Sequence, residues 1–179
     1  IGQGYVLSTP LQLAVMTSRV VNGGYAVLPR LNRASINEPK NTRNIPEFPK
    51  LGLSERTLKI IRQALEEVVN NSAGGTAYDA RIPEPGWQMG GKTGTSQVRR
   101  ITLQEREQGV KKNDELPWHQ RDHALFVGYA PIVNPRYACS VVIEHGGGGA
   151  KAAAPVARDV LRETLRINAS WYRTKKVGA

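Results

Sequence analysis

The sequence predicts an α/β chain of the α+β type, in which strands of an antiparallel sheet are flanked by helices. Three observations predict this class. Apolar residues recur at helical spacing in two early segments and in one late segment. Two runs rich in β-branched and aromatic residues, 124–130 and 137–144, precede the late segment. The connection 131–136 is too short for a parallel crossover, so we expect these two runs to pair as an antiparallel hairpin.

The first helix is expected over 10–21. Thr9 is a suitable N-cap, Pro10 fits the first helical position, and Gln12 completes a capping box. The apolar residues of this segment recur on one face. That inward face would consist of Leu13, Met16 and Val20.

A second helix is expected over 55–70, with Ser54 as its N-cap. A last helix is expected over 152–167, followed by a basic tail over 168–179. Helical spacing assigns an inward face to each. These faces would be Leu58, Ile61, Leu65 and Val68 in the second helix, and Val156, Val160, Leu161 and Leu165 in the last.

The composition is that of a folded chain with a basic surface. It is 40% hydrophobic and 22% charged, which argues against overall disorder. The 25 Lys and Arg against 15 Asp and Glu give a net charge of +10, which is compatible with acidic partners but names none. No apolar run is long enough for a membrane span, and the opening on Ile1 without a leader indicates a processed or truncated chain. The single cysteine, Cys139, rules out an internal disulfide and is expected to fill the core.

The segment Gly90–Ser96 carries the most chemical information. Taken with Gly86, it satisfies the spacing of a phosphate-binding P-loop, G-x-x-x-x-G-K-[ST]. A P-loop needs a buried strand before it and a helix after it. Pro83 and Pro85 exclude that strand, and the residues after Thr93 are poor helix formers. The context therefore argues against nucleotide binding.

The same segment can instead be a K-T-G sequence, Lys92–Gly94, on an edge strand. An ammonium group beside the hydroxyls of Thr95 and Ser96 supplies charge and directed donors for a carboxylate. A glycine in the strand lets a second backbone approach closely, so an extended peptide could pair with the edge. On its own, a K-T-G sequence is also compatible with an exposed basic hairpin.

Several motifs accompany K-T-G in a fixed order, and together they are specific where each alone would be weak. The motifs are Gly2-Gln3-Gly4-Tyr5, Ser8-Thr9-Pro10-Leu11-Gln12, Val21-Asn22-Gly23-Gly24, Gly74-Gly75-Thr76-Ala77, Gly91–Gln97, Arg121-Asp122-His123 and Phe126–Pro131. Together these motifs closely resemble the C-terminal part of the transpeptidase domain of class B penicillin-binding proteins, most like those of the cell-elongation type, to about Ile167.

This resemblance implies a partial penicillin-binding transpeptidase or β-lactamase-like fold, with residues 1–167 forming the C-terminal part of the domain. It also implies an enzyme that acylates a serine with a stem peptide ending in D-Ala-D-Ala and cross-links peptidoglycan. Lys92 would be catalytic, holding the proton network around that serine, and the Thr95 N–H would form half of an oxyanion hole. The implied substrate-binding residues are Thr93, Gly94, Thr95 and Ser96.

The resemblance further implies a periplasmic domain held by an inner-membrane anchor that this chain lacks. The implied partners are the stem peptide, β-lactam antibiotics and a glycosyltransferase of the elongation machinery. The upstream half of the same domain, or another copy, would cover the incomplete sheet. Neither a cofactor nor a nucleic-acid partner is implied.

The departure from the family pattern is the absence of its nucleophile motif. None of the eight serines has Lys three residues later, so S-x-x-K is missing and the chain alone is expected to be inactive. Ser35-Ile36-Asn37 matches S-x-N in form but follows the G-Q-G segment, whereas the family places S-x-N before it. The alternative is a non-catalytic basic module, binding envelope or nucleic acid, on a degenerate copy of the fold.

Two other features remain open at this level. His119 and His123 have the spacing of two metal ligands on one helix face, but Pro117 and the following strand leave little room for a helix. The basic segment 96–121 also contains acidic residues, which favours a solvated loop or lid over a nucleic-acid surface.

Overall fold

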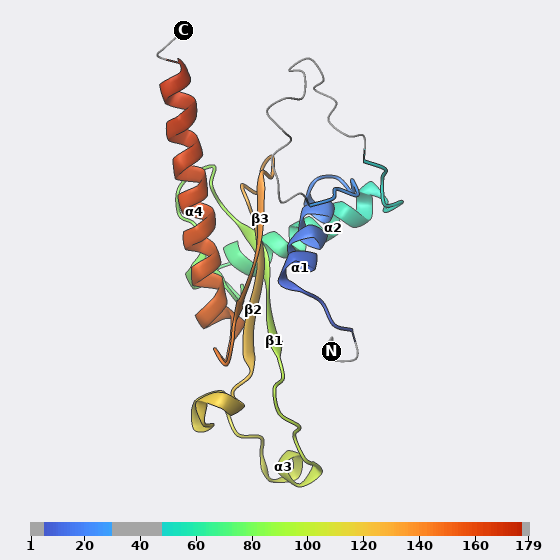
Figure 1. Cartoon of the computed structure of the whole chain (residues 1–179), viewed down its shortest axis with the longest axis vertical. Coiled ribbons are helices and arrows are strands. Elements are labelled where there is room, and N and C mark those ends of the chain that lie inside the picture. The colour runs from blue at the N-terminus through green and yellow to red at the C-terminus, as the bar shows by residue number, and fades with distance from the viewer. Residues whose placement is uncertain (1–5, 30–47, 177–179) are drawn as a thin grey trace, which may run out of the picture.

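The computed structural model describes residues 6–29 and 48–176, with side chains to Ala169. A three-stranded antiparallel sheet of order β1-β2-β3 lies between helices (Figure 1). Helix α4 lies on one side of the sheet, while α1 and α2 lie on the other. The elements are α1 (Pro10–Val21), α2 (Glu55–Asn70), η1 (Tyr78–Ala80), β1 (Gly90–Ser96), α3 (Leu103–Gln108), η2 (Asn113–Glu115), η3 (Trp118–Gln120), β2 (His123–Ala130), β3 (Tyr137–Ile143) and α4 (Gly149–Lys176).

The predicted hairpin is confirmed. Strands β2 and β3 pair antiparallel with Val127 opposite Ser140, and β1 pairs antiparallel with the other side of β2. Strand β2 begins one residue earlier than expected, and β3 ends one residue earlier. Strand β1 is an edge strand of the described sheet, as the K-T-G interpretation required.

The first two helices have the predicted bounds and caps. The Gln12 N–H donates to Thr9 Oγ1 at 3.2 Å, and the Thr9 N–H donates to Gln12 Oε1 at 2.8 Å. The predicted inward face of α1 is wrong at Met16, which is 52% exposed, whereas Thr17 beside it is buried. Thr17 tolerates burial because its hydroxyl donates to the Leu13 carbonyl at 2.9 Å. The buried face of α1 is therefore rotated by one residue relative to the predicted face.

The predicted inward face of α4 is half right. Leu161 and Leu165 are buried, but Val156 and Val160 are exposed. Three alanines occupy the sheet-facing positions instead, because their small side chains let the helix backbone lie close to the sheet. These alanines are Ala153, Ala154 and Ala157.

The predicted bounds of the last helix are wrong at both ends. Helix α4 starts at Gly149 rather than 152, and it continues past 167 to Lys176. Residues 168–176 contain no Gly or Pro to end a helix, so nothing in the sequence stops it at 167.

The core joins the sheet to α4 and to the segment between α2 and β1. Phe126 and Met89 are fully buried within it. Cys139 packs against this core, and its burial raises the pKa of the thiol to about 11. This agrees with the prediction that the cysteine fills the core.

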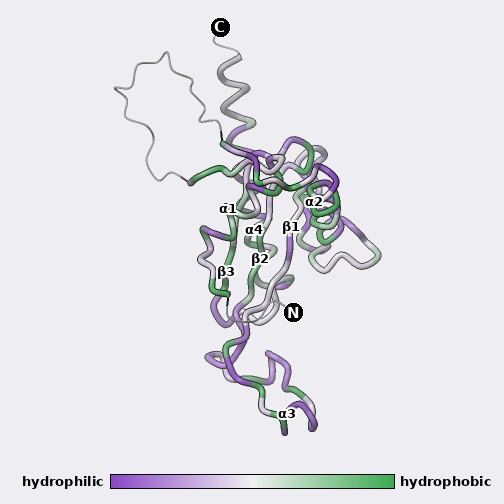
Figure 2. Tube along the Cα trace, turned by 90° about the vertical axis from the view of Figure 1, so that its right-hand side faces the viewer, coloured by the Kyte–Doolittle hydropathy of each residue, from purple (hydrophilic) through white to green (hydrophobic). Residues whose placement is uncertain are grey.

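The connection between β1 and β2 extends beyond the end of the sheet (Figure 2). It contains both hydrophilic and hydrophobic residues. Helix α3 lies in it, held by an ion pair in which Arg99 donates to both carboxylate oxygens of Glu105, at 2.7 and 2.5 Å. This short helix was not predicted, although Thr102 and Glu105 have the spacing of an N-cap signal, and the Glu105 N–H donates to Thr102 Oγ1 at 3.2 Å. Within the described residues, no helix combines the length and apolarity that crossing a membrane requires.

Candidate functional site

The K-T-G residues lie in the middle of β1, where the strand passes from the buried interior to solvent. Gly90 and Gly91 are buried, Thr93 and Gly94 are half-buried, and Lys92 is exposed. Thr95 and Ser96 are exposed, opposite Ala124 and His123 of β2. The structure therefore places all five predicted site residues, Lys92 to Ser96, on one accessible strand.

The buried glycines of β1 are required by its close packing on β2. A Cβ added at Gly91 would lie 2.7 Å from Phe126 Cε1, and closer still to Phe126 Cζ and to the Val127 carbonyl oxygen. A Cβ at Gly90 would lie 2.6 Å from the ring of Tyr129. A side chain at Gly91 would displace the strand, and one at Gly90 would displace the strand or the buried Tyr129 ring, so the glycines allow the K-T-G strand to lie close to the core.

A cavity of about 460 Å³ lies beside the K-T-G residues. Its second wall is the N-terminus of α4, where the last two residues of the glycine run meet the helix. The lining residues are Lys92, Thr93, Gly94, Thr95, Gly148, Gly149 and Ala150. The second wall was not predicted from the sequence, although the glycine run 146–149 was the available signal.

Two contacts fix the side chains of the K-T-G residues. Lys92 Nζ donates to the carbonyl oxygen of Thr93 at 3.0 Å. The hydroxyl of Thr93 lies 3.3 Å from that of Thr76, in the turn that follows α2. A role for Thr76 was not predicted from the sequence, where this residue is only part of the motif Gly74-Gly75-Thr76-Ala77.

An aromatic cluster lies where β2 begins and β3 ends. The ring of His145 makes edge contacts with Trp118 at 4.5 Å and with His123 at 4.7 Å between centroids. The His145 N–H donates to His123 Nδ1 at 2.9 Å. His119 belongs to η3 and His123 to β2, so the two do not share a helix face. In the part of the chain that is described, no group of three or more His, Cys, Asp or Glu side chains is placed to hold a metal.

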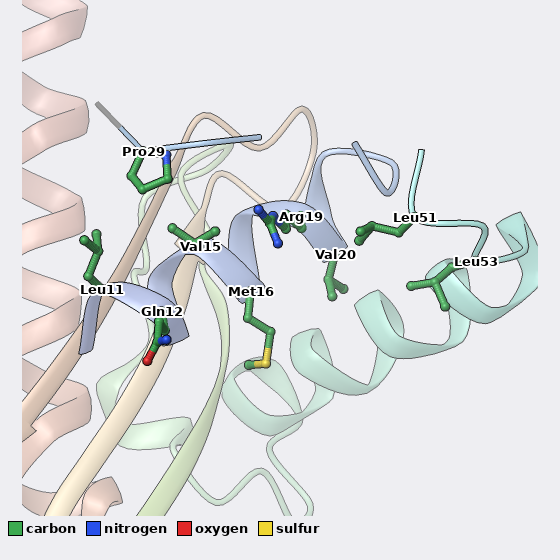
Figure 3. Close-up of a pocket in the computed structure, with 9 residues that line it drawn as sticks. All are labelled: Leu11, Gln12, Val15, Met16, Arg19, Val20, Pro29, Leu51 and Leu53. Atoms are coloured by element: carbon green, nitrogen blue, oxygen red, sulfur yellow. The ribbon is translucent and has the colours of Figure 1, made fainter. Parts of the chain in front are cut away.

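A separate groove of about 500 Å³ runs along α1, away from β1 (Figure 3). Its lining is mainly apolar, and several of these side chains are exposed to solvent, including Leu53 at 44% and Met16 at 52%. The nine lining residues are Leu11, Gln12, Val15, Met16, Arg19, Val20, Pro29, Leu51 and Leu53. Apart from Arg19 and Gln12, this groove offers little for polar chemistry.

Two segments named in the sequence analysis, Gly2-Gln3-Gly4-Tyr5 and Ser35-Ile36-Asn37, lie outside the described residues.

Comparisons of sequence and of structure both match this chain to penicillin-binding proteins and peptidoglycan transpeptidases. Residues 1–162 match the family model of the penicillin binding protein transpeptidase domain. Over 163 residues the chain is 39% identical to the peptidoglycan D,D-transpeptidase MrdA of Acinetobacter baumannii, which covers 87% of this chain and 23% of that protein. The chain spans about a quarter of the length of the curated relatives it matches.

Two solved structures show the same fold. Pseudomonas aeruginosa PBP2 in complex with WCK 5153 aligns with a TM-score of 0.66 and 32% identity, over 90% of this chain and 30% of that one. The apo transpeptidase domain of Burkholderia pseudomallei penicillin-binding protein 3 aligns with a TM-score of 0.65 and 26% identity, over 92% of this chain and 44% of that domain.

Proposed function

We propose that this chain, which belongs to the penicillin binding protein transpeptidase family, forms one wall of the active site of a peptidoglycan D,D-transpeptidase. The observation that carries the proposal is the K-T-G sequence on an accessible edge strand beside a cavity of about 460 Å³. The whole protein would cross-link stem peptides through a serine acyl-enzyme. It would also bind β-lactams, which imitate the D-Ala-D-Ala terminus.

The strand geometry suits this role. Side chains alternate along a strand, so Thr93 and Thr95 lie on one face and Lys92 on the other. The two threonine hydroxyls would donate to the carboxylate of the substrate, while Lys92 would act on the proton network of the serine. The Thr95 N–H would stabilise the oxyanion that forms during acyl transfer, a contribution of about 3 kcal/mol for one such donor. Gly94 and Ser96 would let the peptide backbone lie along the edge.

The nucleophile would come from an S-x-x-K segment outside these 179 residues, because none of the eight serines here begins that motif. In acylation, the serine oxygen attacks the carbonyl carbon, the terminal D-Ala leaves as an amine, and its proton comes from the base network. The acyl group then passes to an amine of a second strand. This chain alone would be inactive.

The groove along α1 supports a second part of the proposal. Apolar side chains such as Leu11 and Met16 are exposed there, at 53% and 52%. The remaining part of the same transpeptidase domain would cover this side of the sheet and bury such groups. The whole protein would be a periplasmic domain on an inner-membrane anchor, working with a glycosyltransferase.

A fluorescent penicillin tests the proposal. It should label covalently the protein that contains this chain together with S-x-x-K, and it should leave these 179 residues alone unlabelled. Lys92→Ala should reduce labelling of the longer protein at least tenfold, whereas Lys59→Ala, which removes an exposed charge on α2, should not. If the longer protein is not labelled, the proposal fails and the non-catalytic module takes its place.

A further inference from the structure

We propose that Thr76 is a positioning residue for the carboxylate site, because it orients the hydroxyl proton of Thr93. The inference rests on the proposed function, in which Thr93 binds the carboxylate of a stem peptide or β-lactam. Thr76 belongs to a different element from the K-T-G strand, the turn after α2, and its hydroxyl has a specific role in the carboxylate site.

The turn that holds Thr76 is hydrogen-bonded to the end of α2. The Gly75 N–H donates to the Asn71 carbonyl at 2.8 Å, and the Ala77 N–H donates to the Val68 carbonyl at 2.9 Å. A Cβ at Gly75 would lie 2.7 to 2.9 Å from three carbonyl oxygens at the end of α2, so only glycine fits there. Ala77 is buried at 2% exposure. Thr76 is therefore held between two fixed residues.

The strand that holds Thr93 is tied to the same helix end. Asn70, the last residue of α2, donates from Nδ2 to the Met89 carbonyl at 2.9 Å, one residue before β1. Thr93 itself pairs with Phe126, which is fully buried. The two hydroxyls, 3.3 Å apart, thus belong to residues whose backbone is held on both sides.

The chemistry of a hydroxyl then decides which oxygen donates. Each hydroxyl has one proton and two acceptor lone pairs. Thr93 can hydrogen-bond to a carboxylate only by donating. Its single hydroxyl proton must therefore not be donated to Thr76. With an anion bound, Thr76 donates to Thr93 Oγ1, and the Thr93 proton is directed at the carboxylate. Hydrogen bonds in such a chain polarise and strengthen each other.

The test compares two probes on the longer protein that carries S-x-x-K: benzylpenicillin and its methyl ester, which lacks the carboxylate. Acylation rates are followed by intact-protein mass spectrometry. Thr76→Val should lower the second-order acylation rate with benzylpenicillin about three- to tenfold, the effect of one lost hydrogen bond. It should leave the rate with the methyl ester unchanged. Thr76→Ser, which keeps the hydroxyl, should behave as wild type.

Thr57→Val is the matched control, because Thr57 belongs to another exposed hydroxyl pair, 2.8 Å from Ser54 Oγ at the start of α2. It should alter neither rate. A Thr76→Val rate equal to wild type with benzylpenicillin, or an equal loss with both probes, would overturn the inference. Failure of wild type to be acylated at all would instead overturn the proposed function, and this inference with it.

Discussion

Gly149→Ala should detach the start of α4 from the K-T-G strand. A Cβ at Gly149 would lie 2.6 Å from the Gly94 carbonyl oxygen, 0.8 Å inside the 3.4 Å at which ordinary contact begins, and it would approach the Leu125 carbonyl oxygen more closely still. Both obstacles are backbone atoms of paired strands, so the helix start must move. Overpacking of this kind costs about 1–3 kcal/mol. Alanine has a higher helix propensity than glycine, and this stabilises the helix by at most about 1 kcal/mol. Because both contacts are with backbone, the cost lies in the upper part of that range, about 2–3 kcal/mol, and the net loss is about 1–2 kcal/mol.

Gly148→Ala is the control for this prediction, because a Cβ at Gly148 meets nothing within 4 Å. Its stability should stay within about 0.5 kcal/mol of wild type. Urea unfolding of the protein that contains this chain, followed by tryptophan fluorescence, measures both variants. A slower acylation by benzylpenicillin should accompany the loss in Gly149→Ala, since this residue lines the cavity beside β1. Equal stabilities for the two variants would refute the reasoning.

Three further predictions follow from burial and charge. Cys139 should resist alkylation at pH 8 in the folded protein and react at once in urea, because its pKa is raised to about 11. The hydrogen bond from Arg162 lowers the pKa of Glu84 below its ordinary 4.5, so its stabilisation is present above that pH and is lost as the pH falls through the lowered pKa. Glu84→Gln should therefore lower the melting temperature at pH 7, by an amount that shrinks below pH 4.5. Leu161→Ala, at a side chain 2% exposed, should cost about 2–5 kcal/mol in urea unfolding.

Elements with strong local signals could be predicted from the sequence. The cap residues Thr9 and Ser54 marked the starts of α1 and α2 correctly, since capping depends only on neighbouring residues. The hairpin could be predicted because its connection is too short for any other pairing. The K-T-G strand could be predicted because Pro83 and Pro85 exclude regular structure before it. The strand was therefore expected to begin near Gly90, as it does.

Features that depend on tertiary packing could not be predicted. The inward face of α4 was misassigned at Val156 and Val160, because apolar character alone cannot show that alanines approach the sheet more closely. The second wall of the cavity, at Gly148, and the contact of Thr76 with Thr93 join segments distant in the sequence. His145 is half-buried against Trp118, a contact that periodicity does not encode.

The most direct test of the central claim is to locate the serine that benzylpenicillin acylates. The longer protein would be treated with the antibiotic, digested, and its modified peptide sequenced by mass spectrometry. We expect a single acylated serine in an S-x-x-K sequence outside these 179 residues, and a marked loss of that adduct in Lys92→Ala. Acylation of any of the eight serines within this chain, or no acylation of the longer protein, would contradict the account.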